Sequence, residues 1–348
     1  MFLYYLEIIQ YKNHQNQVFE FEHKFNVFIG KNGVGKTNIL DAIYYLANFK
    51  SHITSLDSLN INHDSDFFRL YGKFKNDHEV LVKFAPRSKT IEINHVKVQK
   101  YSEVFGHVPL VLASPGDIFL LHDGSEERRK FIDYTISTYH KEYLLKLNQY
   151  HQYLDQRNAH LKQSEKPDLN LIKYYDQHLS ELGSFIYRVR KEAIADLKKM
   201  IIHWYQTIAQ NDDQLSIEYT SQLNQGGLED LYRNTWTKDL ALRRTTAGIH
   251  RDDLTIHMHD QDLKKIASQG QQKSLLYALR IAQAEFIAAK TNKKIIFLLD
   301  DFSDKLDENR RVQLLNLMQT LTFVDQWFIT DTSSASFSLS SDSKIWEI

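Results

Sequence analysis

The stretch FNVFIGKNGVGKTNILDAIYYLANF (residues 25–49) joins a short apolar run, a glycine-containing turn and an amphipathic segment. The first part has the pattern of a buried strand, and the last part has the period of a helix. Between them, Gly30, Gly35, Lys36 and Thr37 have the spacing G-x-x-x-x-G-K-T, which is typical of a P-loop. A strand, a glycine loop and a helix in this order predict an α/β fold with a nucleotide site at the turn.

Each part of this loop has a physical role in holding a triphosphate. Glycines allow the backbone to approach the phosphates, and the free N–H groups at the start of the helix attract anions. We expect Lys36 to act catalytically on the β and γ phosphates and Thr37 to offer its hydroxyl to Mg²⁺. A chance match in a glycine turn is the alternative. The predicted nucleotide contacts are Gly30, Lys31, Asn32, Gly33, Val34, Gly35, Lys36, Thr37 and Asn38.

A second apolar run, IIFLL (295–299), is followed directly by Asp300 and Asp301. Carboxylates at the carboxyl end of a buried parallel strand lie where α/β sheets bind their ligands. We expect Asp300 to hold the metal together with Thr37, and Asp301 to orient or deprotonate the attacking water as a catalytic residue. Aspartate is one methylene shorter than the glutamate often found in this role, so hydrolysis should be slow. A solvated acidic loop is the alternative.

The cluster ASQGQQK (267–273) precedes the helical run SLLYALRIAQAEFIAA (274–289). A turn of this composition is by itself an ordinary helix N-cap. Its position between the P-loop and the acidic strand resembles the signature of ATP-binding-cassette (ABC) ATPases, which reads Leu-Ser-Gly-Gly-Gln. The resemblance implies two ATP molecules sandwiched in a symmetric dimer, each gripped by the signature of the other copy. The signature residues are Ser268, Gln269, Gly270 and Gln271, and Asp307 stands at the D-loop position.

The composition limits the alternatives. The 43 basic and 44 acidic side chains leave a formal charge of -1, so any DNA-binding surface must be local. The chain has no cysteine, which excludes disulfides and thiolate metal sites. We expect a cytoplasmic protein, because there is no basic leader and no run approaches the ~20 apolar residues needed to cross a bilayer.

Residues 126–210 contain little glycine or proline and are predicted to be helical. From Ile172 to Ile208 apolar residues recur three or four apart, which is typical of a helix packed along one side. At ~1.5 Å per residue such helices span tens of Å, so we predict a compact lobe without a long coiled coil. The expected organisation is residues 1–118 and 216–348 for the two parts of an ATPase head, and residues 119–215 for the helical lobe.

Longer phrases resemble one branch of these ATPases, the bacterial RecF family of recombination mediators. They are QYKNH (10–14), FIGKNGVGKTNILDAIYYLANFKSH (28–52), SPGDIFLLHDGSEERRKFID (114–133), AGIHRDDL (247–254), ASQGQQK (267–273) and LLDDFSDKLD (298–307). The resemblance implies an α/β P-loop NTPase of the ABC-ATPase head type with an inserted helical lobe. It also implies an ATP- and Mg²⁺-dependent dimer clamp on gapped DNA that acts with RecO and RecR to load RecA. The same resemblance implies a role in gap repair, DNA replication and SOS induction.

The sequence departs from the expected patterns at several positions. Lys12 stands where arginine is expected, and Ile53 where a basic residue is common. Asp331 occupies the place of the γ-phosphate-sensing histidine of transporter cassettes, and the segment SPGD (114–117) has no glutamine. The first two departures are matters of tuning, and the last two favour a weak ATPase, which we expect DNA to stimulate. A non-hydrolysing ATP-binding switch and an ABC-type head acting on another substrate are the alternatives.

Local basic clusters are the candidate DNA contacts, because each could neutralise phosphates. Acidic residues interleave with them, so a solvated charged helix face is the alternative in each case. The segment His250-Arg251-Asp252 is either a buried structural network or a relay coupled to the nucleotide. The candidate DNA contacts are Arg128, Arg129, Arg188, Arg190, Lys191 and Arg243.

Overall fold

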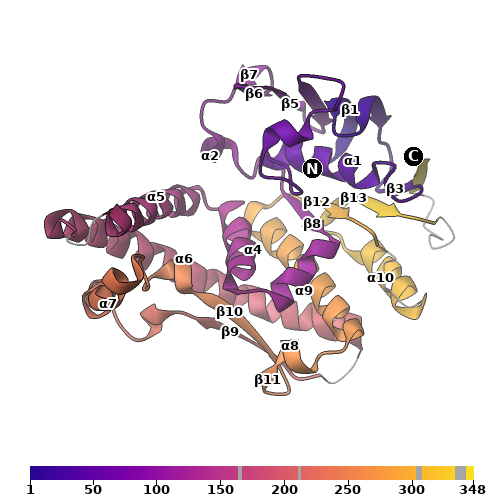
Figure 1. Cartoon of the computed structure of the whole chain (residues 1–348). Helices are drawn as coiled ribbons and strands as arrows, with labels where there is room; N and C mark the ends of the chain where they lie inside the picture. Colours follow the sequence, from indigo (N-terminus) through magenta and orange to yellow (C-terminus); the bar gives the residue numbers. More distant parts are fainter. Residues whose placement is uncertain (164–166, 211–212, 303–307, 334–341) are drawn as a thin grey trace. The chain divides into compact units, whose positions relative to one another are not determined.

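The computed structural model describes residues 1–163, 167–210, 213–302, 308–333 and 342–348, which form two compact units (Figure 1). Unit 1 comprises residues 1–117, 207–209 and 273–348, and unit 2 comprises residues 118–206 and 210–272. The expected start of the helical lobe lies one residue from the start of unit 2. We expected residues 216–272 to belong to the head, but they group with unit 2.

Two strands account for that grouping. Strand β9 (Leu215–Thr220) pairs antiparallel with β10 (Asp253–Met258), and β10 packs against helix α4 (Ser125–Ser137). Because α4 belongs to unit 2, the pair is tied to the helical lobe, although it lies beyond the lobe in sequence.

The central sheet of unit 1 is parallel, with the strand order β14-β3-β13-β12-β8. Its strands are β3 (Phe25–Ile29), β8 (Leu110–Ala113), β12 (Ile295–Leu299), β13 (Val324–Asp331) and β14 (Ser343–Glu347). Every residue of β3 and β12 is buried, as the two apolar runs predict for interior parallel strands. Parallel pairing brings the carboxyl ends of β3, β12 and β13 to one edge of the sheet.

A second sheet in unit 1 is antiparallel, with the order β2-β1-β4-β5-β6-β7. Its strands are β1 (Leu3–Tyr11), β2 (His14–Glu20), β4 (Phe68–Phe74), β5 (His78–Ala85), β6 (Ser88–Ile93) and β7 (Val96–Lys97). Burial alternates along β4, so one face of this sheet enters the core. Helix α1 (Lys36–Asn48) contacts strands of both sheets, and this packing fixes the helix that follows the P-loop.

Three further helices and short turns complete unit 1. Helix α9 (Gln269–Thr291) begins in unit 2 and continues in unit 1, and α10 (Glu308–Thr320) precedes β13. The short elements are η1 (Asp57–Asn60), α2 (Tyr101–Val104) and η2 (Pro115–Asp117). None of the described helices is long and apolar enough to cross a membrane.

Unit 2 is built mainly from helices around the long α6 (Leu169–Ala209), whose 41 residues span roughly 60 Å. The other elements are α3 (Ile118–His122), α5 (Lys141–Gln163), α7 (Leu228–Leu242), α8 (Leu263–Ile266), β11 (Gln261–Asp262), η3 (Gln222–Asn224) and η4 (Ile249–Arg251). The predicted apolar stripe on α6 is buried from Ile172 to Ile208, apart from Val189, which is only partly buried. Gly183 lets α7 come close, because a Cβ there would lie 2.5 Å from Leu228 Cδ1.

Candidate nucleotide site

The P-loop joins β3 to α1 at the carboxyl edge of the parallel sheet. Gly33 and Gly35 have φ angles of +88° and +111°, in the left-handed region that glycine adopts without strain. Gly35 is also crowded, since a Cβ there would lie 2.5 Å from Asn13 Nδ2. Helix α1 begins at the next residue, so the free N–H groups of its first turn belong to the loop region. The loop therefore has the backbone conformation that an anion cradle needs.

The side chain of Lys36 is buried within this loop. Its Nζ donates hydrogen bonds to the carbonyl oxygens of Gly30 at 2.7 Å and Lys31 at 2.9 Å. Only 5% of the residue is exposed. The ammonium is thus held at the loop, where a phosphate oxygen could replace a carbonyl as its partner.

The carboxylate that follows β12 lies against the first turn of α1. Thr37 Oγ1 donates to Asp300 Oδ1 at 2.9 Å, and Thr330 Oγ1 donates to the same oxygen at 2.7 Å. The backbone N–H of Asp300 donates to Ala113 O at 2.9 Å, which ties the residue to β8. The two predicted metal ligands are therefore neighbours. Thr330 was missed by the sequence analysis; its only signal is its place just before Asp331 at the end of β13.

Asp301 has a left-handed backbone, with a φ of +50°. Its N–H donates to Thr330 Oγ1 at 2.9 Å, so one threonine organises both aspartates. Asp331 is 3% exposed and lies beside Ile29 in the pairing of β13 with β3. Three aspartates therefore lie at the strand ends that border the P-loop.

Side chains of the turn between β1 and β2 form hydrogen bonds with the P-loop and with the first turn of α1. Asn13 Nδ2 donates to Val34 O at 2.9 Å, and Asn38 Nδ2 donates to Asn13 Oδ1 at 2.7 Å. His14 Nε2 lies 3.1 Å from Gly35 O, and burial lowers the pKa of His14, so the neutral ring donates this bond. The sequence analysis did not assign these residues a role. In the sequence, the feature that pointed to this turn was the phrase QYKNH (10–14), which resembles the RecF family.

Asp41, in the second turn of α1, is the centre of a buried polar cluster. It accepts hydrogen bonds from Tyr11 Oη at 2.6 Å, Lys12 Nζ at 2.5 Å and Ser51 Oγ at 2.7 Å. His52 Nδ1 lies 2.7 Å from its other oxygen. Burial alone would raise the pKa of Asp41, but His52 and Lys12 hold it well below its usual range. Lys12 therefore fixes the β1–β2 turn to the helix that follows the P-loop.

The signature segment forms the N-terminal turn of α9, in unit 2. Gln271 N–H donates to Ser268 Oγ at 3.2 Å, and Ser268 N–H donates to Gln271 Oε1 at 2.8 Å. This reciprocal pair is a capping box, so within one copy Ser268 acts as the N-cap. Gln269 and Gly270 belong to the same turn, and Asp307 lies outside the described residues. Contact of this segment with the ATP of another copy stays a prediction.

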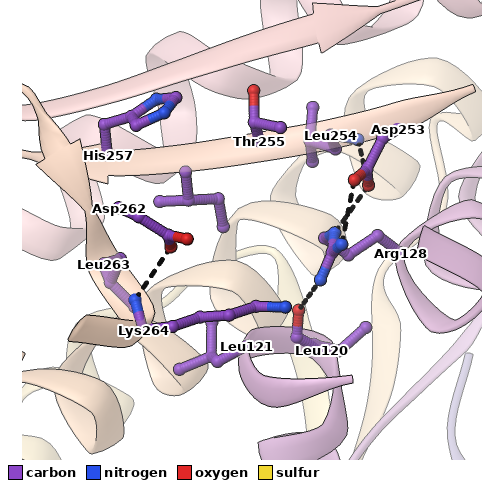
Figure 2. A pocket seen from close by; sticks show the side chains of 11 residues that line it. Leu120, Leu121, Arg128, Asp253, Leu254, Thr255, His257, Asp262, Leu263 and Lys264 are labelled. Carbon is purple, nitrogen blue, oxygen red and sulfur yellow. Dashed lines mark hydrogen bonds and ion pairs between the residues drawn. The ribbon is translucent and has the colours of Figure 1, made fainter. Parts of the chain in front are cut away.

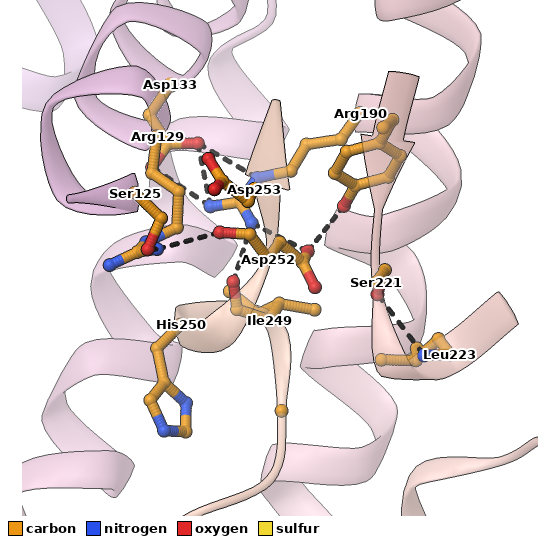
Figure 3. Close-up of polar contacts among 12 residues, drawn as sticks. Ser125, Arg129, Asp133, Arg190, Ser221, Leu223, Ile249, His250, Asp252 and Asp253 are labelled. Carbon is orange, nitrogen blue, oxygen red and sulfur yellow. Dashed lines mark hydrogen bonds and ion pairs between the residues drawn. The ribbon is translucent and has the colours of Figure 1, made fainter. Parts of the chain in front are cut away.

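Two of the candidate DNA contacts are buried, and we withdraw them. Arg190 is 1% exposed, and donates to Asp133 Oδ2 at 3.0 Å and Asp252 Oδ2 at 3.0 Å (Figure 3). Arg128 donates two hydrogen bonds to Asp253, at 2.7 and 3.0 Å, in the wall of a hollow of about 130 Å³ (Figure 2). Guanidinium groups enclosed in this way cannot reach a DNA phosphate.

The other candidates differ in exposure. Arg129 is half-buried and donates to Asp252 O at 2.7 Å, and burial lowers its pKa. Arg188, Lys191 and Arg243 are exposed and remain candidates.

In the segment His250-Arg251-Asp252, His250 and Asp252 are held by hydrogen bonds inside unit 2, whereas Arg251 is exposed. His250 Nδ1 lies 2.9 Å from Tyr150 Oη, and Tyr219 Oη donates to the Asp252 carboxylate. Desolvation lowers the pKa of His250 to about 4. Of the two interpretations offered for this segment, the geometry favours the structural network.

Comparison with known proteins gives one consistent result. The AAA domain family matches residues 5–322. The chain is 39% identical to the DNA replication and repair protein RecF of Flavobacterium johnsoniae, over 95% of this chain and 94% of that protein. It is 38% identical to the protein of the same name from Phocaeicola vulgatus, over 96% of this chain and 91% of that one.

Solved structures agree with these relatives. The recombination mediator protein RecF with ATP, in the RecFOR pathway, matches with a TM-score of 0.88 and 28% identity over 97% of this chain and 93% of that one. An Smc head bound to the C-winged helix domain of ScpA matches with a TM-score of 0.59 and 14% identity, over 97% and 91% of the two chains. The second match concerns the fold alone. Together they confirm the predicted α/β ATPase head.

Proposed function

This chain belongs to the RecF family of DNA replication and repair proteins, and on that premise we propose that it is an ATP-driven clamp on DNA. ATP is bound by the P-loop of one copy, residues 30–38, with Lys36 against the β and γ phosphates. The observation that carries the proposal is the meeting of Lys36, Thr37 and Asp300 at one edge of the parallel sheet. A solved relative described with ATP, at 28% identity over nearly the whole chain, supports the choice of nucleotide.

The donor atoms at this edge fit Mg²⁺. A threonine hydroxyl and a carboxylate oxygen lie 2.9 Å apart, and both are the hard oxygen donors that this ion takes together with water and phosphate. Thr37 and Asp300 would hold the ion. When bound, it would neutralise charge on the phosphates during hydrolysis. Asp301, whose N–H is fixed by Thr330, would orient the attacking water.

The second copy completes the site in this proposal. Ser268 and the N–H groups of the first turn of α9 present a helix N-terminus, which favours negative charge. The P-loop already supplies such a terminus to the phosphates of its own ATP. Ser268 would therefore grip the ATP of the partner copy, and ATP binding would close a symmetric dimer around DNA.

DNA at single-strand gaps is the proposed substrate, and RecO, RecR and RecA are the proposed partner proteins in gap repair and SOS induction. The match to a RecF structure described in the RecFOR pathway supports this choice. Action in the cytoplasm is part of the same proposal. Arg188, Lys191 and Arg243 would contact DNA phosphates, because their side chains are exposed.

A direct test is the retention of gapped duplex DNA, measured by fluorescence anisotropy with and without ATP and Mg²⁺. We expect ATP to strengthen binding by the parent chain and to have no effect on Lys36→Met. Equal affinity with and without ATP in the parent chain would contradict the clamp.

One feature favours a second candidate, an ATP-binding switch with almost no turnover. Asp301 has a side chain one methylene shorter than glutamate, so its carboxylate reaches less far toward a γ phosphate. Multiple-turnover phosphate release separates the two functions. Turnover that exceeds that of Lys36→Met, which should not bind ATP, by tenfold or more identifies an ATPase, and turnover no faster than that of Lys36→Met identifies a switch.

A further inference from the structure

Three large aliphatic side chains are exposed together beside the P-loop helix. Ile53, Leu56 and Leu59 are 51%, 59% and 64% exposed, and all lie in the segment ITSLDSLN (53–60). We call these three residues the aliphatic lip. Single exposed leucines are ordinary, but three within seven residues concentrate exposed apolar surface in one short segment, and concentrated apolar surface is typical of binding sites.

The segment that carries the aliphatic lip is held in place by polar contacts. Ser51 Oγ accepts the N–H groups of Ile53 at 3.0 Å and Thr54 at 3.2 Å. Asp57 accepts hydrogen bonds from Tyr45 Oη at 2.5 Å and Lys89 Nζ at 2.9 Å. The backbone is thus anchored while the aliphatic side chains point outward. Asp57 is the one charged residue between 53 and 60, and Lys89 neutralises it.

Both ends of the segment are bonded to the surroundings of the P-loop. At one end, Lys12 N–H donates to Asn60 O at 2.8 Å, and Asn62 Nδ2 donates to Lys12 O at 2.6 Å. Lys12 is followed by Asn13, which binds the P-loop at Val34 O.

At the other end, His52 N–H donates to Asp41 Oδ1 at 2.8 Å. Asp41 lies five residues after Lys36, or roughly 7.5 Å along α1. The segment is therefore bonded to the two elements that hold the P-loop, the β1–β2 turn and α1.

We propose that the aliphatic lip is part of the surface against which a second copy of this chain closes when ATP is bound. The proposal rests on the proposed function, in which the signature of the second copy meets the P-loop. Three aliphatic side chains with no unpaired charge suit the core of a protein interface and offer nothing to a DNA phosphate.

The absence of cysteine from the chain permits a clean labelling experiment. The variant Leu56→Cys carries a single thiol in the aliphatic lip, and Val96→Cys carries one on β7, where Val96 is 70% exposed. Val96 pairs with Ile93, at the end of β6 away from Lys89, the residue that binds Asp57, so Val96 is an exposed control in the same unit but outside the aliphatic lip. The rate of reaction with a maleimide is measured with and without ATP and Mg²⁺, and light scattering of the same samples gives the state of association.

We expect ATP to slow labelling of the Leu56→Cys thiol at least fivefold and to leave the Val96→Cys thiol unchanged. Adding Ser268→Arg to Leu56→Cys removes the predicted grip on the partner's ATP, so the protection should disappear although ATP still binds. Unchanged labelling of the lip thiol in a sample that has dimerised would overturn the inference and leave the proposed function intact. A parent chain that stays monomeric with ATP would overturn both.

A second measurement uses the leucines themselves. In the double variant Leu56→Gln, Leu59→Gln, the loss of two leucines that the dimer would bury should weaken ATP-dependent dimerisation by roughly tenfold or more. Binding of a fluorescent ATP analogue at monomer concentrations should be unchanged. Val96→Gln should dimerise like the parent chain. Equal dimerisation of all three proteins contradicts the role of the aliphatic lip.

Discussion

The P-loop site of unit 1 and the buried arginine networks of unit 2 are both built from basic and acidic side chains, but they differ in what satisfies the charges. At the P-loop, within the described part of the chain, Lys36 Nζ donates to two backbone carbonyls and the Asp300 carboxylate accepts from two hydroxyl groups. In unit 2, Arg157 is fully buried and pairs with Asp239 at 2.8 Å and Asp176 at 2.7 Å. The charges of Lys36 and Asp300 are therefore not paired with each other and can be shared with a ligand, whereas the charge of Arg157 is neutralised by carboxylates of the fold.

The largest expected effect is on stability in unit 2. Arg157→Ala leaves the buried Asp239 carboxylate without its cationic partner, so the free energy of unfolding should fall by about 3–5 kcal/mol. Urea denaturation followed by circular dichroism measures this. Arg188→Ala, at an exposed position of the same unit, should stay within about 0.5 kcal/mol of the parent chain. Similar losses in the two variants would erase the distinction between the two kinds of arginine.

The next largest effect is on the pH dependence of stability, which should differ between His250 in unit 2 and Asp41 in unit 1. Burial lowers the pKa of His250 to about 4 from 6.5. Between these pH values the unfolded chain binds a proton that the folded chain does not. The free energy of unfolding therefore decreases as the pH falls through this window, by up to about 3 kcal/mol. Asp41, with its pKa held low, loses its contribution only below about pH 4.

Variants at these two positions provide the measurement. Between pH 6.5 and 4, unfolding of His250→Gln should depend less steeply on pH than that of the parent chain, and Asp41→Asn should lack the further decrease that the parent chain shows below about pH 4. Parallel curves for His250→Gln and the parent chain would show that His250 takes up its proton equally in the folded and unfolded states.

In unit 1 the expected effect is on chemistry. Asp301→Asn should lower single-turnover phosphate release by about 10²-fold, because it removes a charge that orients the attacking water. Its free energy of unfolding should match that of the parent chain, and it should still bind ATP. Lys36→Met is the comparator that loses nucleotide binding. A wild-type rate in Asp301→Asn would move the role to another carboxylate at the same edge.

The smallest effect is expected at the exposed basic residues. Arg188→Ala and Lys191→Ala should each weaken DNA binding modestly and reduce the slope of log affinity against log salt by about 1. Titrations of gapped duplex DNA at several salt concentrations measure this slope. Lys130→Ala is a matched control, because Lys130 is exposed but already paired with Glu126 and Glu127. An unchanged slope in Arg188→Ala and Lys191→Ala would place the DNA elsewhere on the chain.

The P-loop was readable from the sequence because its chemistry depends on local spacing. Gly35 and Lys36 are adjacent in sequence to the groups they serve, and Asp300 follows its strand directly. Thr330 and Asn13 could not be assigned, because their partners lie far away along the chain and meet them only through strand pairing and the β1–β2 turn. Fold class and the buried stripe of α6 followed from periodicity in the same local way.

The basic clusters were not readable for the opposite reason. The segment SEERRKF (125–131) has the composition of an exposed, charged helix face. In the structure, however, α4 packs against β10, and Arg128 is buried there against Asp253. Neighbouring basic residues can therefore differ in burial. Arg190 is buried and Lys191 is exposed, since the helical period points them to different sides of α6. Burial of a charged side chain depends on which partner carboxylate the fold supplies, and sequence spacing does not contain that information.

The central claim is that Ser268 serves the ATP of the other copy. It is tested most directly by mixing two variants that are each inactive, Lys36→Met and Ser268→Arg, and measuring ATP hydrolysis with gapped DNA. A mixed dimer has one complete site, formed by the P-loop of the Ser268→Arg copy and the signature of the Lys36→Met copy. The account predicts partial recovery of hydrolysis in the mixture. If Ser268 acts only as an N-cap within its own copy, either Ser268→Arg alone will hydrolyse ATP like the parent chain or the mixture will be as inactive as its components, and each result would contradict the clamp mechanism.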